Sequence, residues 1–281
     1  MHYGTVSSEI GPSPGQFSGI RVARTKTGAQ APKQKRKFIV NMQTDKHRPP
    51  DRREENLSVP FDLYGFAVRM ERLLRERGCR FTPGGFAVIE PEWCLREIPE
   101  NWMVRPFSKA SQTPDPSSTL LCPFEGDAEL IGHLRKLPER IDVWKRYAGV
   151  CGFDLSPCAD RTEDEQRFML WTDGMVAGFL ALNGIALVPN FRIGGPETLS
   201  VLDAMPRGVP YAAGTLGCAR ESSALGEALF RWKLTLLRPS FLLVYGSLQD
   251  RKKAILRAEG VPFRVVADYR SLCFAACRKV A

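Results

Sequence analysis

The amino-acid sequence predicts an α/β protein in which repeated strand–helix units form a mainly parallel sheet, either TIM-barrel-like or open and doubly wound. Between residues 149 and 268, short apolar segments alternate with segments of helical pattern, and most of the apolar segments end at a small or polar residue. The segment 1–60 is instead rich in Gly, Pro, Ser and basic side chains. This composition predicts a flexible basic N-terminal arm, residues 1–58, ahead of a single α/β domain, residues 59–281. The apolar segments of the repeat are 150–154, 185–190, 210–214, 241–246 and 263–268.

Length and composition are those of a globular protein. The 281 residues are 43% hydrophobic and 25% charged, which is enough to bury a sizeable core. No apolar run approaches the roughly 18 residues that a membrane-spanning helix needs. The segment from Met1 to Gly19 is polar and lacks the charged-then-apolar order of a secretory signal. We therefore expect a cytoplasmic protein with no membrane partner.

Positive charge is concentrated in the N-terminal arm. The segment 1–60 holds eleven Lys and Arg against five Asp and Glu, so it contributes +6 of the formal net charge of +9. Such an arm suits contact with the phosphates of DNA or RNA, because each neutralised phosphate releases counterions. A solvated tail is the equally weighted alternative. The candidate nucleic-acid contacts are Arg21, Arg24, Lys26, Lys33, Lys35, Arg36 and Lys37.

Order is expected to begin near Val59, with a basic amphipathic helix from Phe61 to the natural stop at Gly78. The arginines of this helix either contact nucleic acid or pair with Glu71 and Glu76, and pairing is the preferred interpretation. Further along, the sequence predicts strands at 86–90 and 119–124, an irregular packed segment at 93–107, a loop at 108–118 and a helix at 129–137.

The helices of the repeat have recognisable ends. Thr162 and Glu165 form a capping-box pattern at the start of a helix that runs to residue 182, and Asn183 with Gly184 is the expected stop. Proline is tolerated in the first turn of a helix that opens at residues 194–197. Two more helices are predicted, one ending at 237 and one starting at 247 or 250 and ending at 259.

Cysteine and histidine usage disfavours several classes of site. The eight cysteines include no Cys-x-x-Cys pair, and of the three histidines only His133 lies outside the arm. We expect most cysteines to be buried thiols, and we expect neither a metal site nor a cofactor. The sequence also lacks the Walker, dinucleotide-binding and Gly-x-Ser-x-Gly motifs. Histidine-dependent nucleophilic catalysis is therefore disfavoured as well.

The candidate site is the crevice onto which the carboxyl ends of parallel strands open. Asp154 and Glu221 are the candidate general acid and base. Asn190 and Arg192 suit the orientation of an anionic or sugar-like group. The ordinary alternative is that polar residues and glycine end these strands because turns need them. The candidate ligand-binding residues are Ser156, Asn190, Arg192, Thr215, Cys218, Arg220, Tyr245 and Ser247.

Several of these segments together resemble a known family. Residues 154–156, 183–194, 214–218 and 244–247 resemble the family catalogued as domain of unknown function 4417, and residues 105–109 resemble its first motif. The resemblance covers roughly residues 105–268 and implies an α/β body without assigned chemistry in a protein of phages, plasmids or bacteria. The chain departs from the family at Leu155, where phenylalanine is usual, and at Ile193, where tryptophan is common.

Some members of that family are labelled as rolling-circle replication initiators. A nickase of that kind needs a pair of metal-binding histidines and a tyrosine nucleophile. Since this body holds one histidine, that mechanism is not expected here.

Three functions remain open from the sequence. The first is a mobile-element protein that binds nucleic acid through the basic arm. The second is an enzyme that acts on a nucleotide, a nucleobase or a sugar phosphate at the strand-end crevice. The third is an interaction module whose partner is a host protein. The sequence leaves the substrate and the oligomeric state open.

Overall fold

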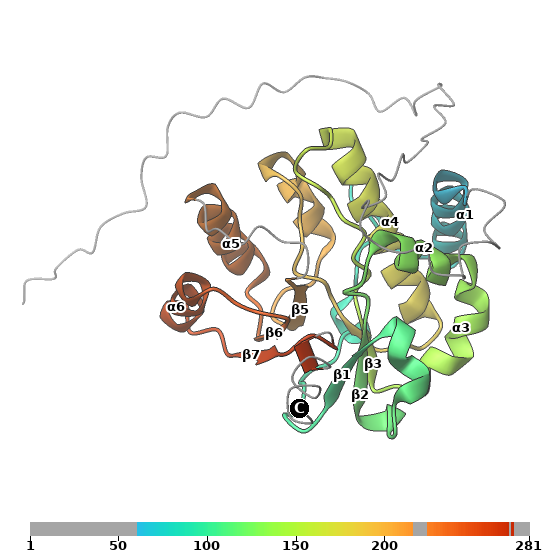
Figure 1. Ribbon diagram of the computed structural model, residues 1–281. Helices are drawn as coiled ribbons and strands as arrows, with labels where there is room; N and C mark the ends of the chain where they lie inside the picture. Colours follow the sequence, from blue (N-terminus) through green and yellow to red (C-terminus); the bar gives the residue numbers. More distant parts are fainter. Residues whose placement is uncertain (1–60, 216–223, 270, 273–281) are drawn as a thin grey trace, which may run out of the picture. The chain divides into compact units, whose positions relative to one another are not determined.

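The computed structural model of the protein describes residues 61–215, 224–269, 271 and 272 (Figure 1). The chain divides after Pro49 into two units, and every described residue belongs to the second. The predicted arm, residues 1–58, lies outside the described residues. The structure is therefore that of the α/β unit.

The described part of the α/β unit contains seven strands whose spatial order follows the chain. One sheet has the order β1-β2-β3-β4, the other has the order β5-β6-β7, and all their ladders are parallel. A parallel bridge between Asn190 and Ala212 links the end of β4 to β5. The predicted mainly parallel α/β sheet is confirmed. The strands are β1 (Met103–Pro106), β2 (Thr119–Cys122), β3 (Gly149–Cys151), β4 (Leu187–Val188), β5 (Pro210–Gly214), β6 (Phe241–Tyr245) and β7 (Phe263–Val266).

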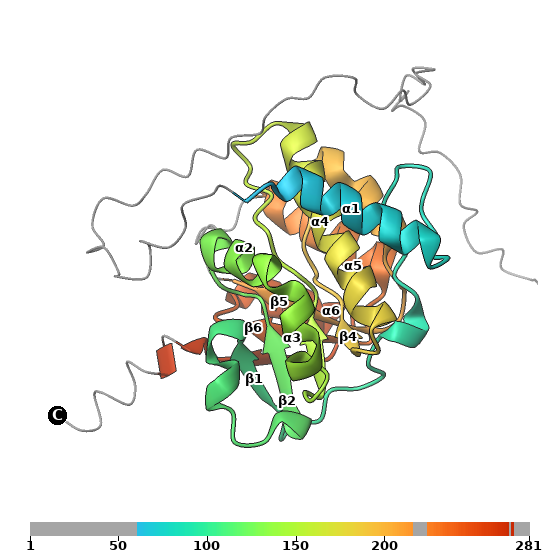
Figure 2. The same ribbon diagram turned by 90° about the vertical axis from the view of Figure 1, so that its right-hand side faces the viewer.

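Helices cover one face of these strands. Most of their buried apolar side chains share a large cluster with alternate strand residues such as Leu121, Val150 and Tyr211. Figure 2 shows α1 lying alongside α4, the longest described helix. The α-helices are α1 (Leu63–Glu76), α2 (Asp127–Arg135), α3 (Leu137–Trp144), α4 (Glu163–Leu182), α5 (Ala224–Leu237) and α6 (Asp250–Ala258). The 3₁₀ helices are η2 (Pro91–Trp93), η3 (Phe107–Gln112), η4 (Pro116–Ser118) and η5 (Pro196–Ala204).

On the other face, side chains from different strands pack against one another. Cys151, Val188 and Leu243, from three strands, share a second cluster whose buried members include no helical residue of the described chain. Successive strand residues face opposite sides, so Leu120 and Leu121 fall in different clusters. Crossovers of one hand between strands added in chain order leave all the helices on one side. The sheet therefore curls around the inner cluster.

The curled sheet stays open between its two edge strands. Within the described residues no ladder joins β1 to β7. Instead, Arg264 of β7 donates from Nη1 to the carbonyl oxygens of Pro99 and Glu100, ahead of β1, at 2.8 and 2.7 Å. The fold is an open, barrel-like α/β sheet. A closed TIM barrel is not confirmed, and the described helices do not cover both faces as a doubly wound sheet requires.

Two predicted helices begin and end where their local signals lie. The α4 capping box is present, because Thr162 Oγ1 accepts from Glu165 N–H while Thr162 N–H donates to Glu165 Oε2.

In α1, Arg75 pairs with Glu71, and Nη2 of Arg75 lies 2.7 Å from the Glu71 carboxylate. The second pair, Arg72 with Glu76, has an N–O distance of 3.7 Å. The preferred interpretation of the α1 arginines as partners of its glutamates is confirmed for these two.

Two sequence predictions of strands are corrected. The predicted strand at 86–90 forms only one bridge among the described residues, from Phe81 to Ala87. The chain reverses at the Gly84-Gly85 turn, and the resulting hairpin is very short. Within the predicted irregular segment at 93–107, Met103–Pro106 is strand β1. Among the described strands it pairs with β2 alone, and proline is tolerated on such an edge. The predicted loop at 108–118 holds η3 and η4.

Candidate active site

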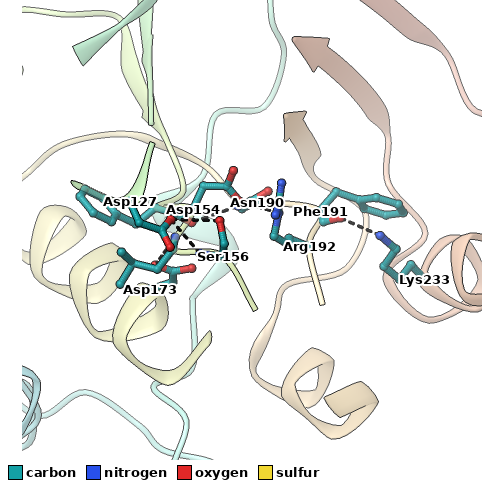
Figure 3. Close-up of polar contacts among 10 residues, drawn as sticks. Asp127, Asp154, Ser156, Asp173, Asn190, Phe191, Arg192 and Lys233 are labelled. Atoms are coloured by element: carbon teal, nitrogen blue, oxygen red, sulfur yellow. Dashed lines mark hydrogen bonds and ion pairs between the residues drawn. The ribbon is translucent and has the colours of Figure 1, made fainter. Parts of the chain in front are cut away.

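The carboxyl ends of β3 and β4 bring three predicted site residues into contact. Asp154 follows β3, while Asn190 and Arg192 follow β4, and the two strands are paired in parallel. Asn190 Nδ2 donates to Asp154 Oδ1 at 2.7 Å, and Arg192 Nε lies 2.6 Å from the same oxygen (Figure 3). A single carboxylate oxygen thus receives both an amide and a guanidinium.

The backbone around these residues is tightly packed. A Cβ on Gly152 would lie 2.6 Å from the backbone nitrogen of Asn190, so only glycine lets the two strand ends approach this closely. Asn190 Nδ2 also donates to Phe153 O at 3.0 Å. Phe191, between the two polar residues, is held from the other side by Lys233 of α5, whose Nζ donates to Phe191 O at 2.8 Å (Figure 3).

Burial dominates the electrostatics of Asp154. The side chain is buried, with 6% of the residue exposed. Loss of solvation raises the pKa of Asp154 to about 6, and nearby Asp127 adds to the rise. Arg192 and the hydrogen bond from Asn190 oppose the rise without cancelling it. Asp154 therefore exchanges its proton close to neutral pH.

Two more aspartates surround this carboxyl, and neither was a candidate from the sequence. Asp173, on the buried face of α4, accepts from Leu155 N–H at 3.1 Å through Oδ1. Burial, and then the charge of Asp154, raise the pKa of Asp173 well above its usual range. Asp127, in the first turn of α2, accepts from Ser156 N–H and Oγ–H at 3.1 and 3.0 Å (Figure 3). An acidic residue amid the apolar face of a predicted helix was the signal for Asp173.

The candidates at the ends of β5 and β6 form a separate group. Thr215 Oγ1 accepts from Ser247 N–H at 2.9 Å and donates to Tyr245 O at 3.3 Å. The Tyr245 ring is buried beside Phe124, with ring centroids 5.7 Å apart, and its hydroxyl accepts from Tyr269 N–H at 2.8 Å. Burial raises the pKa of Tyr245. These contacts give Tyr245 a place in the inner cluster of the sheet.

Comparisons of the chain with protein-family models, with curated proteins and with solved structures found no match. The resemblance to the family of unknown function stays a prediction. Seven basic residues of the arm, together with Cys218, Arg220 and Glu221, lie outside the described residues.

His133 is placed in a structural role. Its ring is buried, with its centroid 5.3 Å from that of Phe107 and 6.3 Å from that of Trp144, and Nε2 is 3.6 Å from Glu125 Oε2. Glu125 also accepts from Ser108 N–H at 3.1 Å. Burial acts to raise the pKa of Glu125, but the contacts with His133 and Ser108 outweigh it and lower that pKa.

The described residues contain neither a cluster of metal ligands nor a membrane-spanning helix. No three His, Cys, Asp or Glu side chains of the described residues are grouped so as to hold a metal ion. Cys94, Cys122 and Cys151 are buried free thiols, as predicted. Burial raises the pKa of Cys151 to about 12, so it remains protonated near neutral pH. None of the described helices has the length and apolarity to cross a membrane.

Proposed function

We propose that the protein is an enzyme that acts on a nucleotide, a nucleobase or a sugar phosphate at the crevice formed by the ends of β3 and β4. The observation that carries the proposal is the buried Asp154 carboxyl, which contacts a guanidinium and an amide. Its pKa is raised to about 6. A general acid or base works best when its pKa lies near the working pH. Perturbed carboxyls with specific charge partners are enriched at functional sites.

Each residue has a separate part in this proposal. Asp154 transfers a proton to or from a heteroatom of the substrate. Arg192, whose side chain is 20% exposed, holds the ionised form of Asp154 and orients an anionic group of the substrate. Asn190 is a positioning residue, because its amide fixes the Asp154 carboxyl through Oδ1.

Asp154→Asn should abolish turnover while the fold is kept, since the amide has the same shape as the neutral carboxyl. The full chain is incubated with a panel of adenosine monophosphate, uridine monophosphate, uracil, adenine and ribose 5-phosphate. Binding is followed by thermal shift, and conversion by mass spectrometry. We expect one compound to be converted, with a rate that falls at least about 100-fold in the variant. The pH profile of kcat/KM should show an inflection near pH 6.

The matched control is Asp160→Asn, which changes an exposed aspartate in the loop that follows Asp154. It should leave conversion and its pH profile unaltered. The proposal fails if no compound of the panel stabilises the wild-type chain or is converted by it. It also fails if the Asp154→Asn variant converts the substrate at the wild-type rate.

The second candidate function is nucleic-acid binding by a mobile-element protein, and the charge of the arm favours it. With eleven basic against five acidic side chains, the segment 1–60 contributes +6 of the net +9. We expect labelled DNA or RNA to bind the full chain with an affinity that falls steeply as salt rises. A full-length variant with the seven candidate arm residues changed to glutamine should lose most of that salt dependence.

A chain without residues 1–57 is the second comparison in this experiment. Single- and double-stranded DNA and RNA are each titrated across the salt series. Loss of affinity in both altered chains would support the arm as the phosphate-binding part. An unchanged salt slope in both, or no binding by the full chain near physiological salt, would contradict it.

A further inference from the structure

A cavity of about 50 Å³ lies between α4, η5, residues 86–89 and the segments that follow β3 and β4. Its wall is mostly apolar, and three of the residues that line it, Asp173, Asn190 and Arg192, are polar. Asn190 and Arg192 are the residues that contact Asp154. The cavity is therefore next to the proposed catalytic carboxyl.

Asn190 is one of the residues that line this cavity, and its side-chain amide has a buried acceptor without a partner among the described residues. Nδ2 donates to Phe153 O and to Asp154 Oδ1, and both are oxygen acceptors when Asp154 is ionised, which fixes the orientation of the amide. Oδ1 is buried and accepts no hydrogen bond from the described residues. Only 9% of Asn190 is exposed. Buried acceptors in native proteins are nearly always satisfied, so a donor from a ligand or a water is called for.

Asp173 supplies the complementary group. Its Oδ1 accepts from Leu155 N–H, and 9% of the residue is exposed. Burial and the neighbouring Asp154 raise its pKa well above the usual range, which favours the neutral form of the carboxyl. A neutral carboxyl donates one hydrogen bond through its hydroxyl. Two residues that line the cavity thus carry a donor, in the neutral Asp173 carboxyl, and an acceptor, in the Asn190 amide.

Gly174 leaves space over this wall that packing does not explain. Leu170, Asp173, Gly174 and Ala177 all line the cavity, at the spacing of one face of α4. A Cβ on Gly174 would meet no atom within 4 Å, although glycine in a helix interior is unfavourable relative to alanine. Gly178, one turn later, is different, since its Cβ would lie 3.2 Å from Leu74 of α1. Gly178 serves helix packing, whereas Gly174 keeps the cavity open.

We propose that this cavity binds a small neutral amide-type group of the substrate, with its N–H donating to Asn190 Oδ1 and its carbonyl accepting from Asp173. The volume fits a few heavy atoms, since a cavity of about 150 Å³ is needed for benzene. The charge of the wall agrees, because the Arg192 guanidinium is balanced by Asp154 at 2.6 Å. The inference rests on the proposed function in one respect, that the bound group belongs to the molecule on which Asp154 acts.

Acetamide and acetone are the matched probes, because they have nearly the same size and carbonyl but only acetamide carries an N–H donor. Each is titrated into the isotope-labelled full chain, and backbone and side-chain amide shifts are followed by NMR. We expect acetamide to shift Gly174 and the Asn190 side-chain amide with a dissociation constant in the millimolar range. Acetone should cause much smaller shifts. Equal responses to both probes, or no response at these residues, would overturn the inference.

Gly174→Ala separates binding from folding. The added methyl group should raise the melting temperature, because alanine favours the helix and meets no atom, yet weaken acetamide binding about tenfold. Gly132→Ala in α2 is the control, since its Cβ also meets nothing within 4 Å and it is not among the residues that line the cavity. It should raise the melting temperature and leave acetamide binding unchanged. Unaltered acetamide binding in Gly174→Ala, or a lower melting temperature, would contradict the assignment.

The two proposals fail in different ways. Acetamide binding at Gly174 and Asn190 without conversion of any panel compound would support the cavity and contradict the enzyme. Conversion of a panel compound with acetamide and acetone behaving alike would support the enzyme and contradict the cavity.

Discussion

Arg192→Met is expected to destabilise the protein by about 3 kcal/mol at pH 8 and by much less at pH 5. The guanidinium lies 2.6 Å from the buried Asp154 carboxylate, and its loss leaves that charge without its cation. The pKa of Asp154 is already raised to about 6 in the wild type, and Arg192 is what limits the rise. In the variant the pKa of Asp154 should therefore rise further.

The sign of the pH dependence follows from this shift. A raised folded-state pKa contributes stability below the unfolded value, and that contribution is lost as the pH rises through the folded value. For wild-type Asp154 this window runs from its ordinary value of 3.8 to about 6. In Arg192→Met the upper end moves upward, so the extra loss of stability grows between pH 5 and pH 8.

Urea unfolding of both chains at pH 5 and pH 8 measures the effect. Arg80→Met is the control, because Arg80 pairs with Glu90 on the surface and 71% of its side chain is exposed. The hydrogen bond from Arg80 lowers the pKa of Glu90, so that pair stays ionised at both pH values. The control should lose little stability, and the same small amount at either pH, because an exposed ion pair is largely screened by solvent. An equal loss for Arg192→Met at both pH values would show that Asp154 is not the group involved.

Gly152→Ala is expected to destabilise the protein by about 3 kcal/mol. Its Cβ would lie 2.6 Å from the backbone nitrogen of Asn190 and 3.4 Å from the carbonyl carbon of Pro189. Backbone atoms cannot turn aside as the end of a flexible side chain does, so the segments after β3 and β4 must separate. This separation should also move Asn190 away from Asp154.

Denaturant unfolding gives the stability change for Gly152→Ala, and a carboxyl-carbon NMR titration gives the pKa of Asp154. With the Asn190 hydrogen bond weakened, that pKa should rise above the wild-type value, because the bond acts to lower it. Gly132→Ala again serves as control and should be stabilising by about 0.5–1 kcal/mol. A stability within about 0.5 kcal/mol of wild type for Gly152→Ala would contradict this prediction. It would mean that the segments after β3 and β4 can move apart at little cost despite their close packing.

Elements with strong local signals could be predicted from the sequence. The capping box and the Asn183-Gly184 stop locate α4 because they act within one turn of the chain. Strand β1 could not be predicted in this way, since it is a four-residue edge strand that ends in proline. Strand β4 is two residues long where 185–190 was predicted, because the apolar pattern continues past the part that is paired.

The candidate site could be predicted in part. Asp154, Asn190 and Arg192 were found because they follow strands, and parallel neighbours bring such residues together. Thr215 and Ser247 also follow strands, yet they bond to one another around the end of β6. Position in the chain does not fix which way a side chain turns. Asp173 had a signal in the sequence, but its contact with Leu155 required the packed structure, because that contact joins a helix to a loop.

The chain-order arrangement of the strands also keeps the entropy lost in assembling the site small. The hydrogen bonds of Asp173 to Leu155 and of Asn190 to Asp154 span 18 and 36 residues. The entropy lost in closing a loop grows only with the logarithm of its length, and short closures favour rapid folding. Because each strand within a sheet pairs with the one before it, a chain leaving the ribosome meets each partner already synthesised. The contacts of Asp154 with Asn190 and Arg192 lie within residues 154–192, so both partners are synthesised before the β5-β6-β7 sheet.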